Sequence, residues 1–123
     1  MNNLMKTLGF TALLSLSALT LQGCSSGLEP DTFSVELNEM DYGSRNPPTV
    51  ITIRSNIADP IEVTNVTVNN GQCSYMGHDT RFNFPLHFQM GQIFRLRLKQ
   101  CNFSNVVQVD IETTKGNASY QFN

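Results

Sequence analysis

The 123-residue sequence is poor in the side chains on which catalytic and metal sites depend. It has only two histidines and three cysteines, no C-x-x-C pair, no G-x-S-x-G nucleophile elbow and no glycine-rich phosphate loop. A basic excess is missing too, because 8 basic residues stand against 10 acidic ones, and this argues against nucleic-acid binding. After residue 24 no long apolar run and no sustained helical spacing occurs, so no membrane span is expected there. The missing ligand and phosphate-loop motifs mean that no metal or cofactor site is expected either.

The N-terminus, in contrast, carries an uncharged apolar run of 14 residues from Leu8 to Leu21, preceded by one positive charge at Lys6. This is shorter than the ~20 residues that cross a membrane as a helix, and it is typical of the core of a secretory signal. Leu21-Gln22-Gly23-Cys24 ends the run and resembles the lipobox of bacterial lipoprotein precursors. The resemblance implies that residues 1–23 are a signal helix removed by cleavage and that Cys24 is lipidated.

The same resemblance implies a location. One acyl chain binds membranes marginally, whereas two or more anchor a protein stably. Ser25 follows the cysteine in place of the aspartate that retains many lipoproteins in the inner membrane. We therefore expect an outer-membrane lipoprotein that faces the periplasm, with surface exposure left open, in which residues 24–30 form a polar tether and residues 31–123 the domain.

The other two cysteines, Cys73 and Cys101, then form an even pair in an oxidising compartment. A bond between them would close a loop of about 29 residues and contribute roughly 3 to 4 kcal/mol in the chain-entropy model. The alternative is a pair of metal-binding thiols, but no histidine stands at ligand spacing. We predict a disulfide.

Apolar residues in 31–123 follow the two-residue period of half-buried strands. The clearest run is Phe82 to Phe88, in which Pro85 predicts an edge position or a break. The apolar phase changes between Val63 and Val66, which predicts a bulge near Thr64-Asn65.

Turn signals separate these runs. Asn69-Asn70-Gly71 predicts a tight turn, and Met76-Gly77-His78-Asp79 predicts a loop. Val107, Val109 and Ile111 predict a late strand that continues into a hairpin through Lys115-Gly116-Asn117. Seven or eight short strands without a helix predict an all-β fold, a small antiparallel β-sandwich.

The order of these features supports a second resemblance. Tyr42-Gly43 ends a strand, Pro60-Ile61-Glu62-Val63 and Val66-Thr67-Val68 precede Cys73, and late turns lie at Gly91 and at Thr114-Lys115-Gly116. This order resembles the Hydin-like and major-sperm-protein-like branch of immunoglobulin-type sandwiches. The resemblance covers turn and core positions, and it implies a scaffolding or interaction module without an active site.

Residues with chemical potential are few. His78 lies in the predicted loop and His87 on the polar side of the phenylalanine-rich run, so both are expected at the surface. Glu36, Asp110 and Glu112 alternate with core residues and are interpreted as solvated strand faces.

The charge distribution is uneven along the chain. Residues 24–79 carry two basic and eight acidic residues, a balance of −6, whereas residues 80–123 carry five and two, a balance of +3. We expect Arg95, Arg97 and Lys99, joined by Arg81, to form an outward basic stripe. Such a stripe either pairs with carboxylates on neighbouring strands or docks an acidic partner or anionic lipid.

The leading hypothesis is a non-enzymatic module, held to the membrane through Cys24, that binds a protein partner of the cell envelope. A secretion, conjugation or pilus-type assembly would be its setting. Two alternatives stay open: an envelope hydrolase, which needs the histidines to converge with serine and carboxylate groups, and a carrier of a small apolar ligand. The carrier would line its pocket with Phe82, Phe84 and Phe88.

Overall fold

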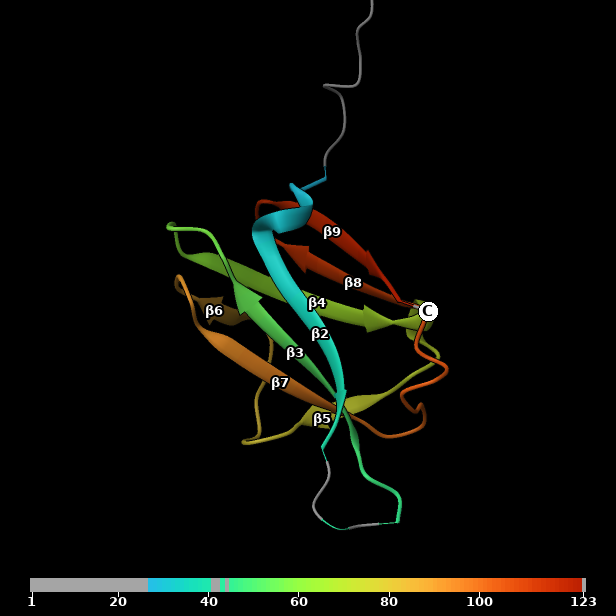
Figure 1. The fold of residues 1–123 in the computed structure, drawn as a ribbon. Coiled ribbons are helices and arrows are strands. Elements are labelled where there is room, and N and C mark those ends of the chain that lie inside the picture. Colours follow the sequence, from blue (N-terminus) through green and yellow to red (C-terminus); the bar gives the residue numbers. More distant parts are fainter. Residues whose placement is uncertain (1–26, 41–42, 44, 123) are drawn as a thin grey trace, which may run out of the picture.

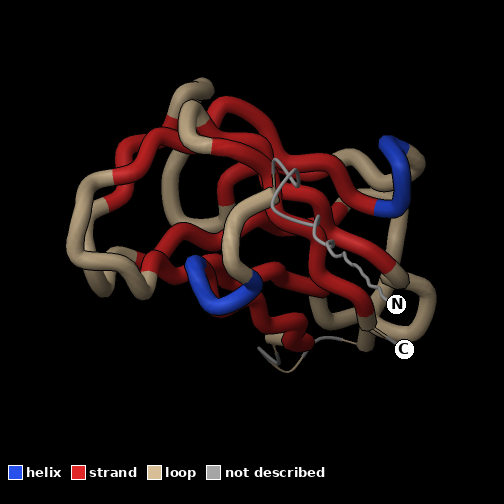
Figure 2. The backbone as a smooth tube through the Cα atoms, turned by 90° about the horizontal axis from the view of Figure 1, so that it is seen from above, coloured by secondary structure: helices blue, strands red, loops and turns tan. Residues whose placement is uncertain are grey.

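Two antiparallel sheets form the domain in the computed structural model, which describes residues 27–40, 43 and 45–122 (Figure 1). The first sheet has the strand order β2-β3-β7-β5 and the second the order β6-β4-β8-β9. The strands are β2 Phe33–Glu39, β3 Thr49–Ser55, β4 Ile61–Val68, β5 Tyr75–Gly77, β6 Leu86–Phe88, β7 Ile93–Leu98, β8 Gln108–Thr113 and β9 Gly116–Gln121. Two 3-10 turns, η3 (Pro30–Thr32) and η4 (Asn69–Gly71), lie apart from each other (Figure 2).

This order is that of an immunoglobulin-like sandwich of the constant type. In that arrangement the strands A, B, E and D form one sheet and C, F and G the other. Here β2, β3, β7 and β5 take the first four places, and β4, β8 and β9 take the other three. Strand β6 is added at the outer edge of β4. The predicted all-β sandwich and its number of strands are confirmed.

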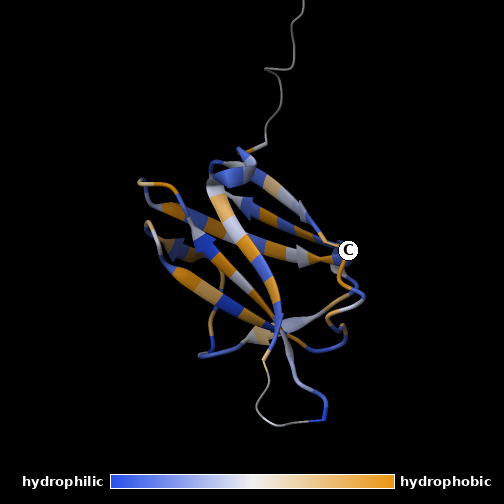
Figure 3. Ribbon diagram, in the orientation of Figure 1, coloured by the Kyte–Doolittle hydropathy of each residue, from blue (hydrophilic) through white to orange (hydrophobic). Residues whose placement is uncertain are grey.

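The core lies between the two sheets and follows from the alternation of side chains along each strand. In the first sheet the register aligns Leu37, Ile51 and Leu96 across β2, β3 and β7. Ile51 and Leu96 have no exposed surface, and Val109 and Ile111 are as deeply buried on β8. The alternation of apolar and polar segments is visible along the strands in Figure 3.

A bulge and a left-handed turn adapt β4 to this core. The β4–β8 register shifts between Val63 and Asn65, which lets Val63 and Val66 both face inward although their numbers differ in parity. The turn after β4 places Asn69, Asn70 and Gly71 at positive φ, a region that asparagine and glycine tolerate. Both features confirm the sequence predictions.

The expected effect of Pro85 is confirmed, and two other details of the strand prediction are wrong. The phenylalanine-rich run is a strand only over Leu86–Phe88, which begins after Pro85 and lies at an edge of the second sheet; Pro85 donates no backbone hydrogen bond. Strand β5 occupies part of the predicted loop. Before β8 the core-facing valine is Val106 and not the expected Val107, since Val106 is buried and Val107 is 55% exposed.

The predicted disulfide is present between Cys73 and Cys101, whose Cα atoms are 5.6 Å apart. It joins the β4–β5 connection to the β7–β8 connection, so it lies at one end of the sandwich. Asn69 reinforces this end: its side chain donates to the Asn105 carbonyl (2.8 Å) and accepts from the Val107 amide (2.8 Å).

The polypeptide enters the domain at the opposite end. Gly27 forms a parallel bridge with Asn117 on β9, and the Leu28 amide donates to the Asn117 carbonyl at 2.7 Å. The Tyr120 hydroxyl donates to the Pro30 carbonyl (2.9 Å) and accepts from the Phe33 amide (3.3 Å). Of the stretch 24–30 expected as a tether, residues 27–30 therefore lie against the domain.

Candidate docking site

The short strand β5 is the edge of the first sheet and pairs on one side only, with β7. Two backbone bonds define the ladder: the His78 amide donates to the Arg95 carbonyl, and the Lys99 amide donates to the Ser74 carbonyl, both at 3.0 Å. Hydrogen-bonded pairs alternate along an antiparallel ladder. The N–H and C=O groups of Tyr75 and Gly77 consequently point away from β7, toward the free edge.

The segment that follows β5 turns back beside this edge. A β-carbon on Gly77 would collide with the Thr80 carbonyl oxygen and would lie 3.0 Å from Cδ2 of Phe82. The backbone φ of Gly77 lies outside the left-handed region, so conformation does not require a glycine at this position. The lack of space for a β-carbon does. The close approach brings residues 81–83 alongside β5.

Phe82 closes this side of the sandwich. Its ring stacks on Tyr75 with centroids 6.5 Å apart and meets Phe94 and Phe84 edge-on at 4.7 and 5.2 Å. The Tyr75 hydroxyl donates to the Val66 carbonyl at 2.5 Å, which ties β5 to the second sheet. Burial raises the pKa of Tyr75 above its ordinary value of 10.0. These rings pack on one another, as expected of core residues.

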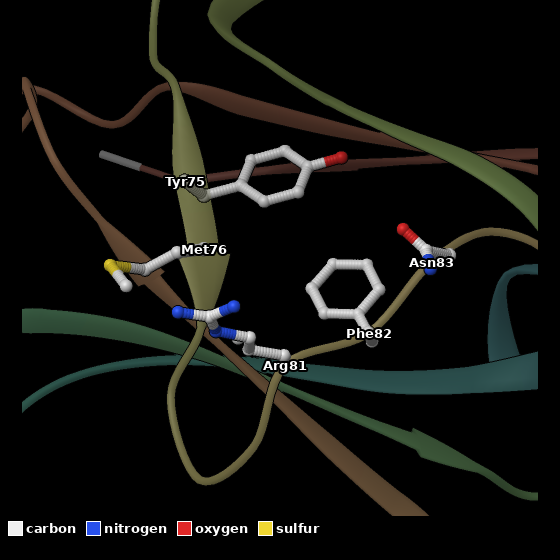
Figure 4. Close-up of a pocket in the computed structure, with 6 residues that line it drawn as sticks. Tyr75, Met76, Arg81, Phe82 and Asn83 are labelled. Atoms are coloured by element: carbon white, nitrogen blue, oxygen red, sulfur yellow. The ribbon is translucent and has the colours of Figure 1, made fainter.

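A pocket of about 560 Å³ remains between β5 and residues 81–83 (Figure 4). This is within the range of small-ligand sites. The close-up shows the Tyr75 and Phe82 rings lying parallel, with the Arg81 guanidinium near Met76 and the Asn83 amide on the far side. Met76 is 49% exposed, so the rim of the pocket is partly apolar. Its lining consists of Tyr75, Met76, Gly77, Arg81, Phe82 and Asn83.

Two arginines, Arg95 and Arg97, lie on the outer face of β7 beside this pocket, and together with Arg81 and Lys99 they form the basic surface around β5. Arg97 is the cross-strand neighbour of Met76, and its Nε–H donates to Nδ1 of His78 at 3.4 Å. Arg95 forms an ion pair with Asp79 (Nη1 to Oδ2, 3.4 Å), an exposed contact of the kind that contributes about 0 to 1 kcal/mol.

The four residues of the predicted basic stripe thus surround β5. Arg95 and Arg97 lie on its inner neighbour β7, Lys99 follows β7, and Arg81 lies across the free edge. Within the described part of the chain, ion pairs join Arg95 to Asp79 and His87 to Glu62, and Arg81 takes part in neither.

The outer face of the second sheet has the opposite sign. Asp110 and Glu112 lie on β8 and Glu62 on β4, each between residues that face the core. Asp110 accepts two hydrogen bonds from the Gln108 amide at 2.9 and 3.0 Å and one from the Ser119 hydroxyl. These carboxylates occupy solvated strand faces. Glu36 does so on the first sheet, where it lies in register with Thr52 and Arg95, so acidic side chains occur on the outer faces of both sheets.

The histidines lie on different sheets. His78 follows β5 and contacts Arg97, whereas His87 on β6 pairs with Glu62 (Nδ1 to Oε2, 3.4 Å). Among the residues that the structure describes, no three histidine, cysteine or carboxylate side chains gather as metal ligands. No helix within 27–40, 43 or 45–122 has the length and apolar character to span a bilayer.

Other residues singled out from the sequence fall elsewhere. Cys24, the expected lipidation site, and Tyr42 lie outside the described residues. Sequence reasoning missed β5 itself and therefore the roles of Tyr75, Met76 and Gly77. The run Tyr75–Gly77 is too short to show a period, but a glycine between an apolar residue and a turn signals a close backbone approach.

Comparisons with known proteins add no assignment: the sequence and its fold match no protein-family model, no curated protein and no solved structure. The fold defines a small all-β sandwich, and its function has to be argued from the surfaces described above.

Proposed function

We propose that this protein is a non-enzymatic, lipid-anchored module that docks an acidic protein partner of the cell envelope on the basic surface around β5. The observation that carries the proposal is the gathering of Arg81, Arg97 and Lys99 around one exposed sheet edge, with Arg81 outside the described ion pairs. A concentrated basic surface raises the association rate of an acidic partner and selects against basic ones.

The proposed anchor would leave the basic surface around β5 accessible to a partner. Two residues, Ser25 and Ser26, separate Cys24 from Gly27, which is already paired with Asn117, and an extended backbone spans at most about 10 to 11 Å over these three residue steps. A lipid on Cys24 would hold the η3 end of the domain next to the membrane. Strand β5 lies at the other end of the molecule from η3 (Figure 1), so the basic surface would face away from the lipid.

Confinement to a membrane also supplies the affinity that a small surface lacks. Two proteins held on one membrane meet at a raised effective concentration, so weak contacts suffice for stable docking. The setting that we propose is a secretion, conjugation or pilus-type assembly in the outer membrane, with the domain in the periplasm.

Charge reversal tests the docking surface. The tagged full-length protein is cross-linked in intact cells and recovered from membranes as Arg81→Glu/Arg97→Glu, with Lys115→Glu as the control. Lys115 is an exposed cation in the β8–β9 turn, at the other end of the sandwich from β5. Loss of the partner from the double variant alone supports the proposal, and equal recovery from all forms refutes the surface.

Anchoring is tested separately. Cells expressing the wild-type protein or its Cys24→Ser variant are fed an alkyne analogue of palmitate, and the recovered protein is examined for label. Label on the wild type alone is expected. Label on neither form, with the protein absent from the membrane fraction, would refute the lipid anchor. The docking surface would then be judged by the first experiment alone.

A further inference from the structure

Strand β5 offers hydrogen-bonding groups that its own sheet leaves unused. The ladder to β7 engages Ser74, Met76 and His78, which turns the N–H and C=O of Tyr75 and Gly77 outward. These residues line the pocket beside residues 81–83. An extended segment in that pocket can therefore receive two donors and two acceptors from the strand edge.

Of the other three sheet edges, those of β9 and β2 are each engaged at one point, and the third is the three-residue strand β6. The edge of β9 is occupied at Asn117 by the Leu28 amide, and the first amide of β2, that of Phe33, donates to the Tyr120 hydroxyl. Residues 81–83 do not form a ladder with β5, because Phe82 fills the space on the core side of Gly77.

The chemistry of the pocket selects what can pair there. The Arg81 guanidinium is a fork of donors suited to a carboxylate, and Arg97 and Lys99 add positive charge nearby. Met76 and the Phe82 ring provide apolar surface for a side chain that alternates with the acidic group. Positive charge and a strand edge at one place fit an extended, acidic peptide better than a compact ligand.

We propose that the pocket binds an extended segment of the partner protein, which adds a strand to β5 and places a carboxylate on Arg81. This rests on the proposed docking function and names the part of the partner that is recognised. The carboxylate belongs either to an acidic side chain or to the free carboxyl end of the partner. Because β5 has three residues, the paired segment is about three residues long, or roughly 10 Å.

Peptide titration tests this site without a known partner. The 15N-labelled full-length protein, held in detergent micelles, is titrated with acetyl-Thr-Val-Thr-Val-Glu-amide, with acetyl-Thr-Val-Thr-Val bearing a free carboxylate, and with the uncharged amide of the latter. A fourth peptide repeats the stronger binder with alternate backbone nitrogens methylated, which removes the donors toward β5. The variants are Arg81→Gln, Arg97→Gln and Lys115→Gln.

The expected result is that at least one carboxylate peptide shifts the amide signals of Tyr75, Gly77 and Phe82, and that the uncharged and methylated peptides bind at least about tenfold more weakly. Arg81→Gln should weaken binding by about tenfold, as expected for loss of a charge-assisted pair. The two carboxylate peptides distinguish a side chain from a terminus.

Other outcomes overturn the site. Equal binding of the methylated peptide, or shifts confined to the outer face of β7 with a loss in Arg97→Gln alone, would refute strand addition in the pocket. The second outcome would leave the basic docking surface intact, so failure of this inference is distinguishable from failure of the proposed function. No binding by either carboxylate peptide also overturns it.

Discussion

Replacing Gly77 by alanine is the change that probes the candidate site most sharply. Gly77 is the last residue of β5, and residues 78–80 fold back beneath it. The added methyl group would collide with the carbonyl oxygen of Thr80, which is a backbone atom. A flexible side chain could rotate away from the added methyl group. A backbone carbonyl cannot, so the segment 78–83 that carries it has to move.

Overpacking of this kind costs about 1 to 3 kcal/mol in the free energy of unfolding. The displacement should also reach the pocket, because Phe82 Cδ2 is the next atom that the methyl group would meet, at 3.0 Å. Arg81 lies between the two contact residues Thr80 and Phe82, so it would shift with them. We therefore expect both a loss of stability and weaker peptide binding.

The matched control is Gly91→Ala, at the turn before β7. A β-carbon there meets no atom within 4 Å, but φ is +81°, so an L side chain is strained by about 1 to 2 kcal/mol. The two variants should lose similar stability for different reasons. Only Gly77→Ala should change the amide signals of residues 78–83 and the affinity for the carboxylate peptides.

Urea unfolding followed by far-UV circular dichroism measures the stabilities, and 15N–1H spectra locate the changes. A Gly77→Ala protein with wild-type stability and unchanged signals in residues 78–83 would contradict a close approach of Thr80 to β5. It would mean that the return segment does not press on β5 as described.

Three further predictions concern the framework. Replacing Cys73 and Cys101 by serine removes the loop constraint and should lower the free energy of unfolding by roughly 3 to 4 kcal/mol; reducing agent should then affect the wild type but not the variant. Ser55→Ala should raise stability by about 1 kcal/mol in urea titrations, because the fully buried hydroxyl has no hydrogen-bond partner among the described residues; an unchanged or lower midpoint would contradict this. Burial raises the pKa of Tyr75 and Tyr120 above 10.0, so the folded state retains protons that the unfolded state loses. Stability should therefore be fully present below pH 10 and fall as the pH rises through the folded-state values, and this fall should shrink in the Tyr75→Phe/Tyr120→Phe double variant.

Much of the framework could be predicted from local pattern. The change of apolar parity between Val63 and Val66 required a bulge, since both residues face one core. Asn69-Asn70-Gly71 required a left-handed turn, and the proposed assignment of Cys24 to a lipid left Cys73 and Cys101 as an even pair, which indicated a disulfide. Each of these depends on chemistry that is contained within a few residues.

The candidate site could not be predicted in the same way. Strand β5 spans three residues and exists because β7 pairs with it, so its own sequence has no period to detect. Arg81 lines the same pocket as Met76, whose cross-strand neighbour is Arg97, and this arrangement depends on the fold of residues 78–83, which spacing does not encode. Arg95 and Arg97 lie along β7 and Lys99 follows it, as expected, but the position of these cations beside the edge strand β5, with Arg81 across that edge, depends on the fold and could not be predicted from spacing.

Site-specific photo-cross-linking in intact cells tests whether a partner docks at β5. A photoreactive phenylalanine analogue replaces Met76 at the β5 pocket or Gln121 on β9 at an edge of the second sheet, each in the otherwise wild-type protein and with Arg81→Glu. Docking at β5 predicts one adduct with an acidic envelope protein from position 76, its loss with Arg81→Glu, and no such adduct from position 121. An adduct that forms equally from both positions, or that persists when Arg81 is reversed, would contradict docking at β5.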